Sequence, residues 1–386
     1  MMNFLWGTPP EPPEKHILVY TDVEADDVAA LRLLYVMKPA GCMVHVVCCL
    51  GNPERKAEIV RILFGDEFEV YTGIGGVKGD TLYEGNNILS AEQCRLFASE
   101  EVDATRKPAQ YPLKKFEFAK NKVIDAVVLL TTPEPFMIDY ENMGLQIDKV
   151  FIMGGFYHSP GFVPSLEQTR VNLSFNWKIS DPDVLKRFLE LMDYRKSAVL
   201  FSSQYFANEW NGNFDKKNNE RMFGCDFITA ILEADNALQA MVINWNRYAT
   251  HDGTKKSMVD RIGMENLGSE FAPADFITTL GVLSVLGYRS ILQKTQRVQF
   301  VKKDDSWEIR TGSEASGIEY VEETNLQTVK ELITNFLNAM VRSKKGCILS
   351  REKKTQMMED LRTLANYTLE CSNGEQNPCS NNSNSD

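Results

Sequence analysis

The stretch HILVYTDVEADDVAALRLL, residues 16–34, decides how the rest of this chain can be interpreted. Its first five residues form a short apolar, β-branched run that is typical of a buried strand. Residues 28–34 form an apolar-rich segment suited to a helix that packs on that strand. In open α/β sheets, ligands bind between the carboxyl end of a strand and the following helix. Three carboxylates occupy that place here: Asp22, Asp26 and Asp27.

Carboxylates crowded together repel one another and lose hydration, so folding alone does not favour this cluster. A helix N-terminus stabilises a carboxylate by roughly 0.3–1 kcal/mol, and a divalent cation does so far more. Hard oxygen ligands suit Ca²⁺ or Mg²⁺. The alternative is plain capping, in which Asp26 or Asp27 caps the helix and the other carboxylates are solvated. The cluster therefore predicts either a metal site or a capped helix.

Composition predicts a soluble, cytoplasmic globular protein. The chain has 386 residues, 43% of them hydrophobic and 25% charged, and a net charge of −11. That charge argues against nucleic acid as the main partner, and no apolar run is long enough to cross a membrane. The N-terminus lacks the pattern of a secretory signal, and the eight cysteines show no zinc spacing. We expect reduced thiols and no membrane partner.

Strand-like runs alternate with helical segments along the first half of the chain. Continuously apolar strands separated by helices predict an α/β fold with an open, mainly parallel sheet and helices on both faces. The expected strands are 16–20, 43–50, 68–72, 123–130, 149–153 and 318–322, with a hairpin of 297–302 and 307–310 around 303–305. The expected helices include 53–64, 276–286 and 326–341.

The expected organisation is one large domain with peripheral segments. Residues 204–270 are rich in Asn and aromatic residues and predict a helical insertion, or lid, near the active-site end of the sheet. The tail is rich in Ser, Asn and Gly, which predicts disorder. The expected divisions are a proline-rich arm at 1–14, the α/β domain at 15–345, a helical extension at 346–370 and the tail at 371–386.

Several motifs in order resemble one enzyme family. VYTDVEADDVAALRLL (19–34) resembles the amino-terminal motif of the inosine-uridine type nucleoside hydrolases, Asp-x-Asp-Pro-Gly-x-Asp-Asp followed by an apolar helix. The resemblance covers roughly residues 16–340 and implies a nucleoside hydrolase-like fold. The later matching segments are Gly51-Asn52, LLTTPEP (129–135), FIMGGFY (151–157), SFNWKISDPDVLKRFLE (174–190) and PADFITTLGVL (273–283).

The resemblance implies a Ca²⁺-dependent hydrolysis of the N-glycosidic bond of ribonucleosides. By position, Asp22 would be both a Ca²⁺ ligand and the general base that removes a proton from the attacking water. Asp27 would be a chelating ligand, and Asp275 a ligand from far along the chain. A backbone carbonyl between residues 132 and 135 would complete the set, and Pro135 falls where the family has its threonine.

The resemblance also implies a set of sugar contacts. Asp26 matches the contact to the ribose 2′-hydroxyl, Asn52 and Asn176 match ribose-binding asparagines, and Met153 matches a methionine of the sugar pocket. Each position after Asp26 also has a structural interpretation. Asn52 suits a turn, Asn176 a cap, Met153 the core, and Asp275 the N-cap of an apolar helix.

This chain departs from the family motifs at several positions. The motifs contain no obvious residue that could protonate the leaving base. His251 and Tyr248 of the expected insertion are candidates if that region forms a lid. The departures are Tyr20 for the first aspartate, Val23 for the proline, Glu24 for the glycine, Ser174 for a glutamate that contacts the ribose 5′-hydroxyl, and Ala274 for a histidine near the base.

Three functions follow from this pattern. The first is an N-ribohydrolase that takes a small-molecule nucleoside and Ca²⁺. The second is a catalytically impaired relative that binds a ribosyl ligand or a partner without turnover, which the departures favour. The third is a metal phosphohydrolase with Asp22 as nucleophile and Glu24 two residues on, although the expected downstream lysine and acidic pair are missing. Members of the family are commonly dimers or tetramers, so the resemblance leaves a homo-oligomer open.

Overall fold

The computed structural model describes six ranges of the chain and five single residues between them. The arm before residue 14, most of the expected insertion at 204–270, the extension at 346–370 and the tail at 371–386 lie outside them. The described residues are 14–75, 122–158, 169–195, 197–206, 274–312 and 317–343, with Phe162, Pro164, Asp235, Leu238 and Met241.

One sheet of eleven strands runs through the described residues, in the order β3-β2-β1-β4-β5-β8-β11-β9-β10-β7-β6. The strands from β3 to β11 pair in parallel, and those from β11 to β6 pair antiparallel. The predicted open, mainly parallel α/β sheet is confirmed. The strands are β1 (Lys15–Thr21), β2 (Cys42–Cys48), β3 (Glu69–Thr72), β4 (Ile124–Leu129), β5 (Ile147–Gly154), β6 (Phe156–Tyr157), β7 (Thr169–Leu173), β8 (Ala198–Ser202), β9 (Leu292–Lys303), β10 (Ser306–Thr311) and β11 (Ile318–Thr324).

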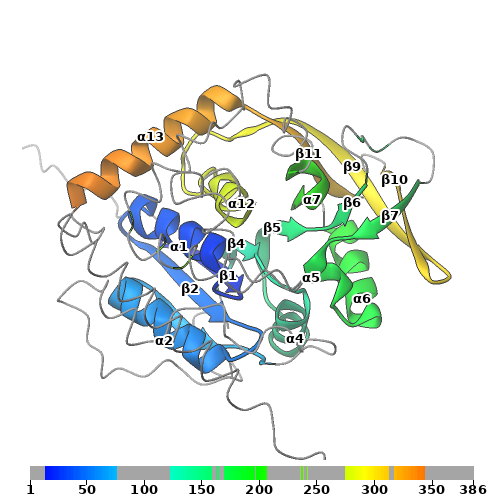
Figure 1. The fold of residues 1–386 in the computed structure, drawn as a ribbon, viewed down its shortest axis with the longest axis horizontal. Helices are drawn as coiled ribbons and strands as arrows, with labels where there is room; N and C mark the ends of the chain where they lie inside the picture. Colours follow the sequence, from blue (N-terminus) through cyan, green and yellow to red (C-terminus); the bar gives the residue numbers. More distant parts are fainter. Residues whose placement is uncertain are drawn as a thin grey trace, which may run out of the picture.

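Helices cover both faces of the parallel part of the sheet (Figure 1). One face carries α1 (Ala25–Met37), α2 (Pro53–Phe64), α12 (Ala274–Val282) and α13 (Leu326–Ser343). The other carries α4 (Glu134–Met143) and α6 (Pro182–Tyr194). Two one-turn helices, α5 (Phe175–Lys178) and α7 (Ser203–Phe206), follow strands β7 and β8. Among the described residues, no helix is both long and apolar enough to cross a membrane.

Strand β1 shows why the sequence builds two cores. Ile17 and Val19 lie in the core beneath α1 and α12, whereas Leu18 and Tyr20 lie in the core beneath α4 and α6. Successive side chains of a strand point to opposite faces, so a strand covered on both faces must be apolar throughout. The uninterrupted apolar run is therefore a consequence of the strand's central position in the sheet.

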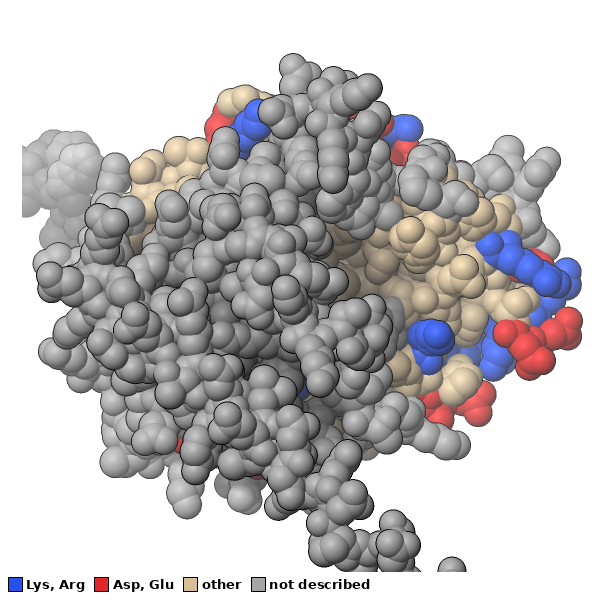
Figure 2. Space-filling view, viewed as in Figure 1, with Lys and Arg blue, Asp and Glu red and all other residues tan. Residues whose placement is uncertain are grey.

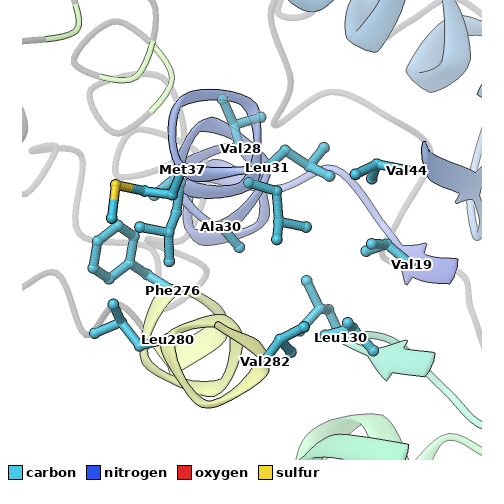
Figure 3. Packing of buried hydrophobic residues seen from close by; sticks show 14 of the residues in the cluster. Val19, Val28, Ala30, Leu31, Met37, Val44, Leu130, Phe276, Leu280 and Val282 are labelled. Atoms are coloured by element: carbon cyan, nitrogen blue, oxygen red, sulfur yellow. The ribbon is translucent and has the colours of Figure 1, made fainter. Parts of the chain in front are cut away.

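Helices α1 and α12 are far apart in sequence but pack against each other (Figure 3). Met37 of α1 points toward Phe276 and Leu280 of α12, within one continuous apolar cluster. Gly281 lets α12 approach the sheet, because a Cβ at this position would stand 3.0 Å from the ring of Phe201 in β8. This packing holds the first turns of both helices at the same end of the sheet.

The structure contains elements that the periodicity of the sequence did not predict. Strand β8 is a five-residue apolar run after an amphipathic helix, and a run that short cannot be distinguished from helix by periodicity. Helix α12 ends at Val282, although we predicted a helix to Leu286. The backbone N–H groups of the next residues donate to carbonyls three residues earlier rather than four, so the α-helix does not continue. The Ser284 hydroxyl donates to the Gly281 carbonyl at 2.8 Å.

The β9–β10 hairpin turns where we predicted it. Ser306 pairs with Lys303, and Asp304 takes a left-handed conformation with φ 51°. Figure 2 shows positively charged and negatively charged side chains interleaved at the end of the molecule where Figure 1 places this hairpin. One pair of opposite charges, Lys303 and Glu308, lies 3.3 Å apart. Interleaved charges of this kind oppose pairing of exposed strands with another chain.

A buried chain of polar rings lies near the amino-terminal end of the sheet. His16 Nδ1 of β1 lies 3.2 Å from His45 Nε2 of β2, and His45 Nδ1 lies 3.4 Å from the Tyr71 hydroxyl of β3. Burial, followed by repulsion from His16 and Lys122, lowers the pKa of His45 from 6.5 to about 3. His45 is therefore neutral in the folded protein at physiological pH.

We predict that His45 makes the folded protein acid-sensitive. The unfolded chain binds a proton at this position near pH 6.5 and the folded chain does not, so stability falls as pH drops below 6.5. Relative to His45→Gln, the wild type should lose about 2 kcal/mol of unfolding free energy between pH 7 and pH 5. Urea denaturation of both proteins at each pH measures this difference. Parallel pH profiles would contradict the assignment.

Candidate active site at the carboxyl ends of the parallel strands

The carboxyl ends of the central strands lie level with one another. Leu129 of β4 pairs with Ile152 of β5, and Met153 pairs with Phe201 of β8. Strand β1 lies between β2 and β4, at the point where the strand order reverses direction. Ligands of open α/β sheets bind in the crevice outside such a switch point. The fold therefore predicts a ligand site at this edge of the sheet.

A cavity of about 300 Å³ opens at this edge, and its described lining divides by charge. The acidic half comes from the residues after β1 and from the start of α12, and consists of Asp22, Glu24, Asp26, Asp27 and Asp275. The neutral half comes from the ends of β4, β5 and β8 and from the segment around α5, and consists of Leu130, Met153, Ser174, Asn176 and Ser203.

The turn after β1 is held by its own side chains. The Thr21 hydroxyl donates to one carboxylate oxygen of Asp27, and the backbone N–H of Glu24 donates to the other at 3.0 Å. The Thr21 hydroxyl also accepts from the Val23 N–H at 3.0 Å. Val23 is fully buried and has φ 55°, a strained conformation for a β-branched residue. These bonds fix Asp27 and the turn from which Asp22, Asp26 and Asp27 line the cavity.

Asp275 arrives in the same cavity from the start of α12. Carboxylate oxygens of Asp26, Asp27 and Asp275 all lie within 4.8 Å of one another. Asp27 and Asp275 are each 1% exposed, whereas Asp26 is half-buried. Asp22, also buried, lines the same cavity. The four aspartates expected from the sequence are thus brought together.

This crowding disfavours ionised carboxylates. Burial, followed by repulsion from Asp22, raises the pKa of Asp26 to about 7. Burial and repulsion from the neighbouring aspartates raise the pKa of Asp27 and of Asp275 well above the ordinary carboxyl value. A carboxylate cluster in this state is stabilised by bound positive charge.

The donor set fits a hard divalent cation. Its members are carboxylate oxygens, which Ca²⁺ and Mg²⁺ prefer. One oxygen of Asp275, Oδ1, is buried and has no hydrogen-bond partner within the described part of the chain. A buried carboxylate oxygen without a partner is costly unless a ligand satisfies it. Asp26, Asp27 and Asp275 are accordingly the described residues best placed to hold such an ion.

The neutral half is built on close packing around Trp177. The Trp177 ring is buried beside Gly154, where a Cβ would stand 2.7 Å from the indole nitrogen. Gly154 also has φ 145°, so this position requires glycine on two grounds. Trp177 anchors α5, and the preceding Asn176 then donates through Nδ2 to the Leu130 carbonyl at 3.3 Å.

Two expected residues lie elsewhere among the described residues. Asn52 is exposed and caps α2, its Oδ1 accepting from the Arg55 N–H at 3.0 Å, and the described cavity lining does not include it. Pro135 is the second residue of α4, where a carbonyl normally accepts a hydrogen bond from the backbone N–H four residues later. Pro135 too is absent from the described cavity lining. Their roles stay predictions. His251 and Tyr248 lie outside the described residues.

Two lining residues, Leu130 and Ser203, are not predicted by the motifs of the sequence. Each directly follows a parallel strand, Leu130 after β4 and Ser203 after β8. That position was the available signal, because the residues after parallel strands gather at one edge. Glu24 and Ser174 were noted as departures from a motif, and both line the cavity.

Solved structures share this fold at very low sequence identity. A purine-preferring ribonucleoside hydrolase from Gardnerella vaginalis matches at 11% identity and TM-score 0.50, over 84% of this chain and 99% of that chain. An inosine-guanosine nucleoside hydrolase matches at 12% and 0.52, over 84% and 99%. The type III effector XopQ, complexed with adenosine diphosphate ribose, matches at 11% and 0.53, over 86% and 94%.

No family model matches the chain, and no curated protein is recognisably similar to it in sequence. Identities of 11–12% establish the fold and nothing finer. The protein therefore has a nucleoside hydrolase-like fold. The narrower resemblance to the inosine-uridine type stays a prediction from the motifs.

We predict that Ca²⁺ stabilises the protein through Asp275. At about 100 times its Kd, a ligand of the folded state adds about 2.7 kcal/mol to the unfolding free energy. Asp275→Asn should abolish most of this gain and should raise the melting temperature without Ca²⁺, because one repelling charge is gone. Thermal melts at several Ca²⁺ concentrations measure both effects.

The matched control is Asp148→Asn, which removes an exposed carboxylate of β5 outside the described lining. It should keep the full response to Ca²⁺. An unchanged response in Asp275→Asn would remove this residue from the metal site.

Proposed function

We propose that this protein hydrolyses the N-glycosidic bond of ribonucleosides, giving ribose and free base, with a Ca²⁺ ion in the acidic half of the cavity. The observation that carries the proposal is the convergence of Asp22, Asp26, Asp27 and Asp275 on one cavity. These are the aspartates that the motif resemblance assigns to metal and sugar. The nucleoside hydrolase-like fold supports the same reaction.

The cation is proposed to be held by Asp27 and Asp275, whose carboxylates belong to the closely grouped set, together with Asp22, which lines the same cavity and which the motif resemblance makes a ligand. Asp26, the third member of that set, is proposed to face the ribose instead. When bound, Ca²⁺ would lower the pKa of a water molecule and orient it. It would also relieve the repulsion that raises the pKa of the buried carboxylates. The proposal thus gives the cluster a reason to exist that capping of α1 alone does not.

Asp22 is proposed as the general base. Hydrolysis forms a bond from the water oxygen to the anomeric carbon and breaks the bond from that carbon to the base nitrogen. The water proton goes to the Asp22 carboxylate, and the departing base takes the electron pair of the broken bond. The base then takes up a proton from solvent, and Asp22 returns its proton to solvent, so that ribose and neutral base result. Asp22 is buried and lines the cavity, which suits a group that exchanges protons with a bound reactant.

The ribose is proposed to lie between the two halves of the cavity. Asp26 accepts a hydrogen bond from a ribose hydroxyl. The Asn176 side-chain amide, whose Nδ2 donates to the Leu130 carbonyl, faces the ribose as well. Met153 supplies an apolar contact at the end of β5. Hydroxyl groups are donors as well as acceptors, so they satisfy the carboxylates that line the acidic half.

We predict that Asp22→Asn lowers kcat by about 10²–10⁴-fold, because the amide cannot take the proton. Reducing-sugar release from a panel of purine and pyrimidine nucleosides, with Ca²⁺ and with a chelator, measures the activity. Asp148→Asn is again the control and should keep wild-type turnover. Turnover that survives both Asp22→Asn and chelation would contradict the assignment.

A second candidate is binding of a ribosyl ligand without turnover. A specific observation favours it: Tyr20, at the position of the first aspartate of the motif, points away into the core and donates to Asp139 at 2.8 Å. The XopQ structure, described as a complex with adenosine diphosphate ribose, shares the fold. Under this candidate, nucleosides or adenosine diphosphate ribose raise the melting temperature while no sugar is released.

A further inference from the structure

The two halves of the cavity differ in what they offer a ligand. With the proposed Ca²⁺ bound, the carboxylates of the acidic half are ionised, and an ionised carboxylate accepts hydrogen bonds but cannot donate them. Leu130 and Met153 have no donor side chains. The described side chains that can donate into the cavity therefore belong to the neutral half: Ser174, Asn176 and Ser203.

Two of these three donors already serve the protein. The Asn176 amide donates to the Leu130 carbonyl at 3.3 Å, and the Ser203 hydroxyl donates to the Gly154 carbonyl at 3.4 Å. Ser174 differs from both. Its Oγ is buried and has no hydrogen-bond partner among the residues that the structure describes, and the residue is 7% exposed.

The backbone around Ser174 keeps this hydroxyl in place. The Ser174 N–H donates to the Gly155 carbonyl at 2.9 Å, and the Ser174 carbonyl accepts from the Lys178 N–H at 2.8 Å. The main chain is thus fully bonded on both sides, and the hydroxyl remains as the unsatisfied group. A buried hydroxyl without a partner costs stability, unless a ligand supplies the missing bond.

We infer that Ser174 is a specificity-determining residue that donates a hydrogen bond to a ligand oxygen carrying no hydrogen of its own, such as an ether or ester oxygen. A hydroxyl can turn to donate or to accept, whereas a carboxylate at the same place would accept only. The cavity therefore takes a ribosyl ligand that is O-substituted at the position facing Ser174. This inference rests on the proposed function, and it adds the class of substrate.

The test uses inosine and its 2′-, 3′- and 5′-O-methyl ethers with Ca²⁺-loaded protein. The quantity is the ratio of kcat/KM for each ether to kcat/KM for inosine. One ether should be hydrolysed by the wild type within about tenfold of inosine. In Ser174→Ala its ratio should fall about fivefold, the worth of one hydrogen bond, and Ser174→Thr should restore it.

The alanine variant separates hydrogen bonding from size. If Ser174 mattered through its volume alone, the smaller side chain would admit the methyl group more readily and the ratio would rise. Ser203→Ala is the matched control, since its hydroxyl is already engaged, and its ratio should stay within about twofold of wild type. A ratio that rises or does not change in Ser174→Ala overturns the inference, as does rejection of all three ethers by the wild type.

A second readout keeps the inference separate from the proposed function. If the wild type releases no base from any of the four compounds, the proposed hydrolysis fails. The shifts in melting temperature produced by inosine and by the ethers then rank binding in the same variants. Selective loss of the ether shift in Ser174→Ala supports the inference, and equal shifts in all variants, or no shift at all, overturn it.

Discussion

Mutual repulsion among buried carboxylates is the constraint on which the rest of this structure depends. Asp22, Asp26, Asp27 and Asp275 share one cavity, and burial with repulsion raises the pKa of the last three. Such a cluster can relax in two ways, by moving apart or by binding positive charge. The packing of the fold prevents the carboxylates from moving apart.

The helices that carry the cluster are too well packed to separate. Helix α1 buries apolar side chains on nearly every side, and α12 packs against it and, through Gly281, against β8. A buried ion pair between Arg32 of α1 and Asp235, 2.6 Å long, adds a further anchor. Breaking such a pair typically costs 3–5 kcal/mol. The carboxylates therefore stay crowded, and bound cations or protons are what remains to relieve them.

Much of this arrangement could be predicted from the sequence, and the part that could not has a physical reason. The apolar run of β1 and the proline-started helix α2 have local patterns, and the structure reproduces them almost to the residue. Strand β8 is too short for periodicity to identify. The meeting of Asp275 with Asp27 depends on helix packing, and only the motif resemblance pointed to it.

The predicted residues that lie outside the cavity lining show the same limit. A Gly-Asn pair after a strand suits either a ligand contact or a helix cap, and Asn52 caps α2. Pro135 lies inside α4, because this helix begins at Glu134, only a few residues after the end of β4. For Asn52, the local backbone thus binds the group that the motif assigns to a ligand. A residue type at a given spacing cannot reveal that competition.

The division of the cavity by charge then separates two tasks. When ionised, the five carboxylates carry more negative charge than one divalent cation can balance, so the ligand groups that face the acidic half must then be donors or cations. Ribose hydroxyls meet that demand whatever base they carry. Under the proposed function, discrimination among ribosyl ligands would therefore come largely from the neutral half, where Ser174 offers a hydroxyl that has no hydrogen-bond partner among the described residues. Ser174, one of the positions that depart from the family motifs, would then change substrate choice without disturbing the carboxylates that the proposed chemistry needs.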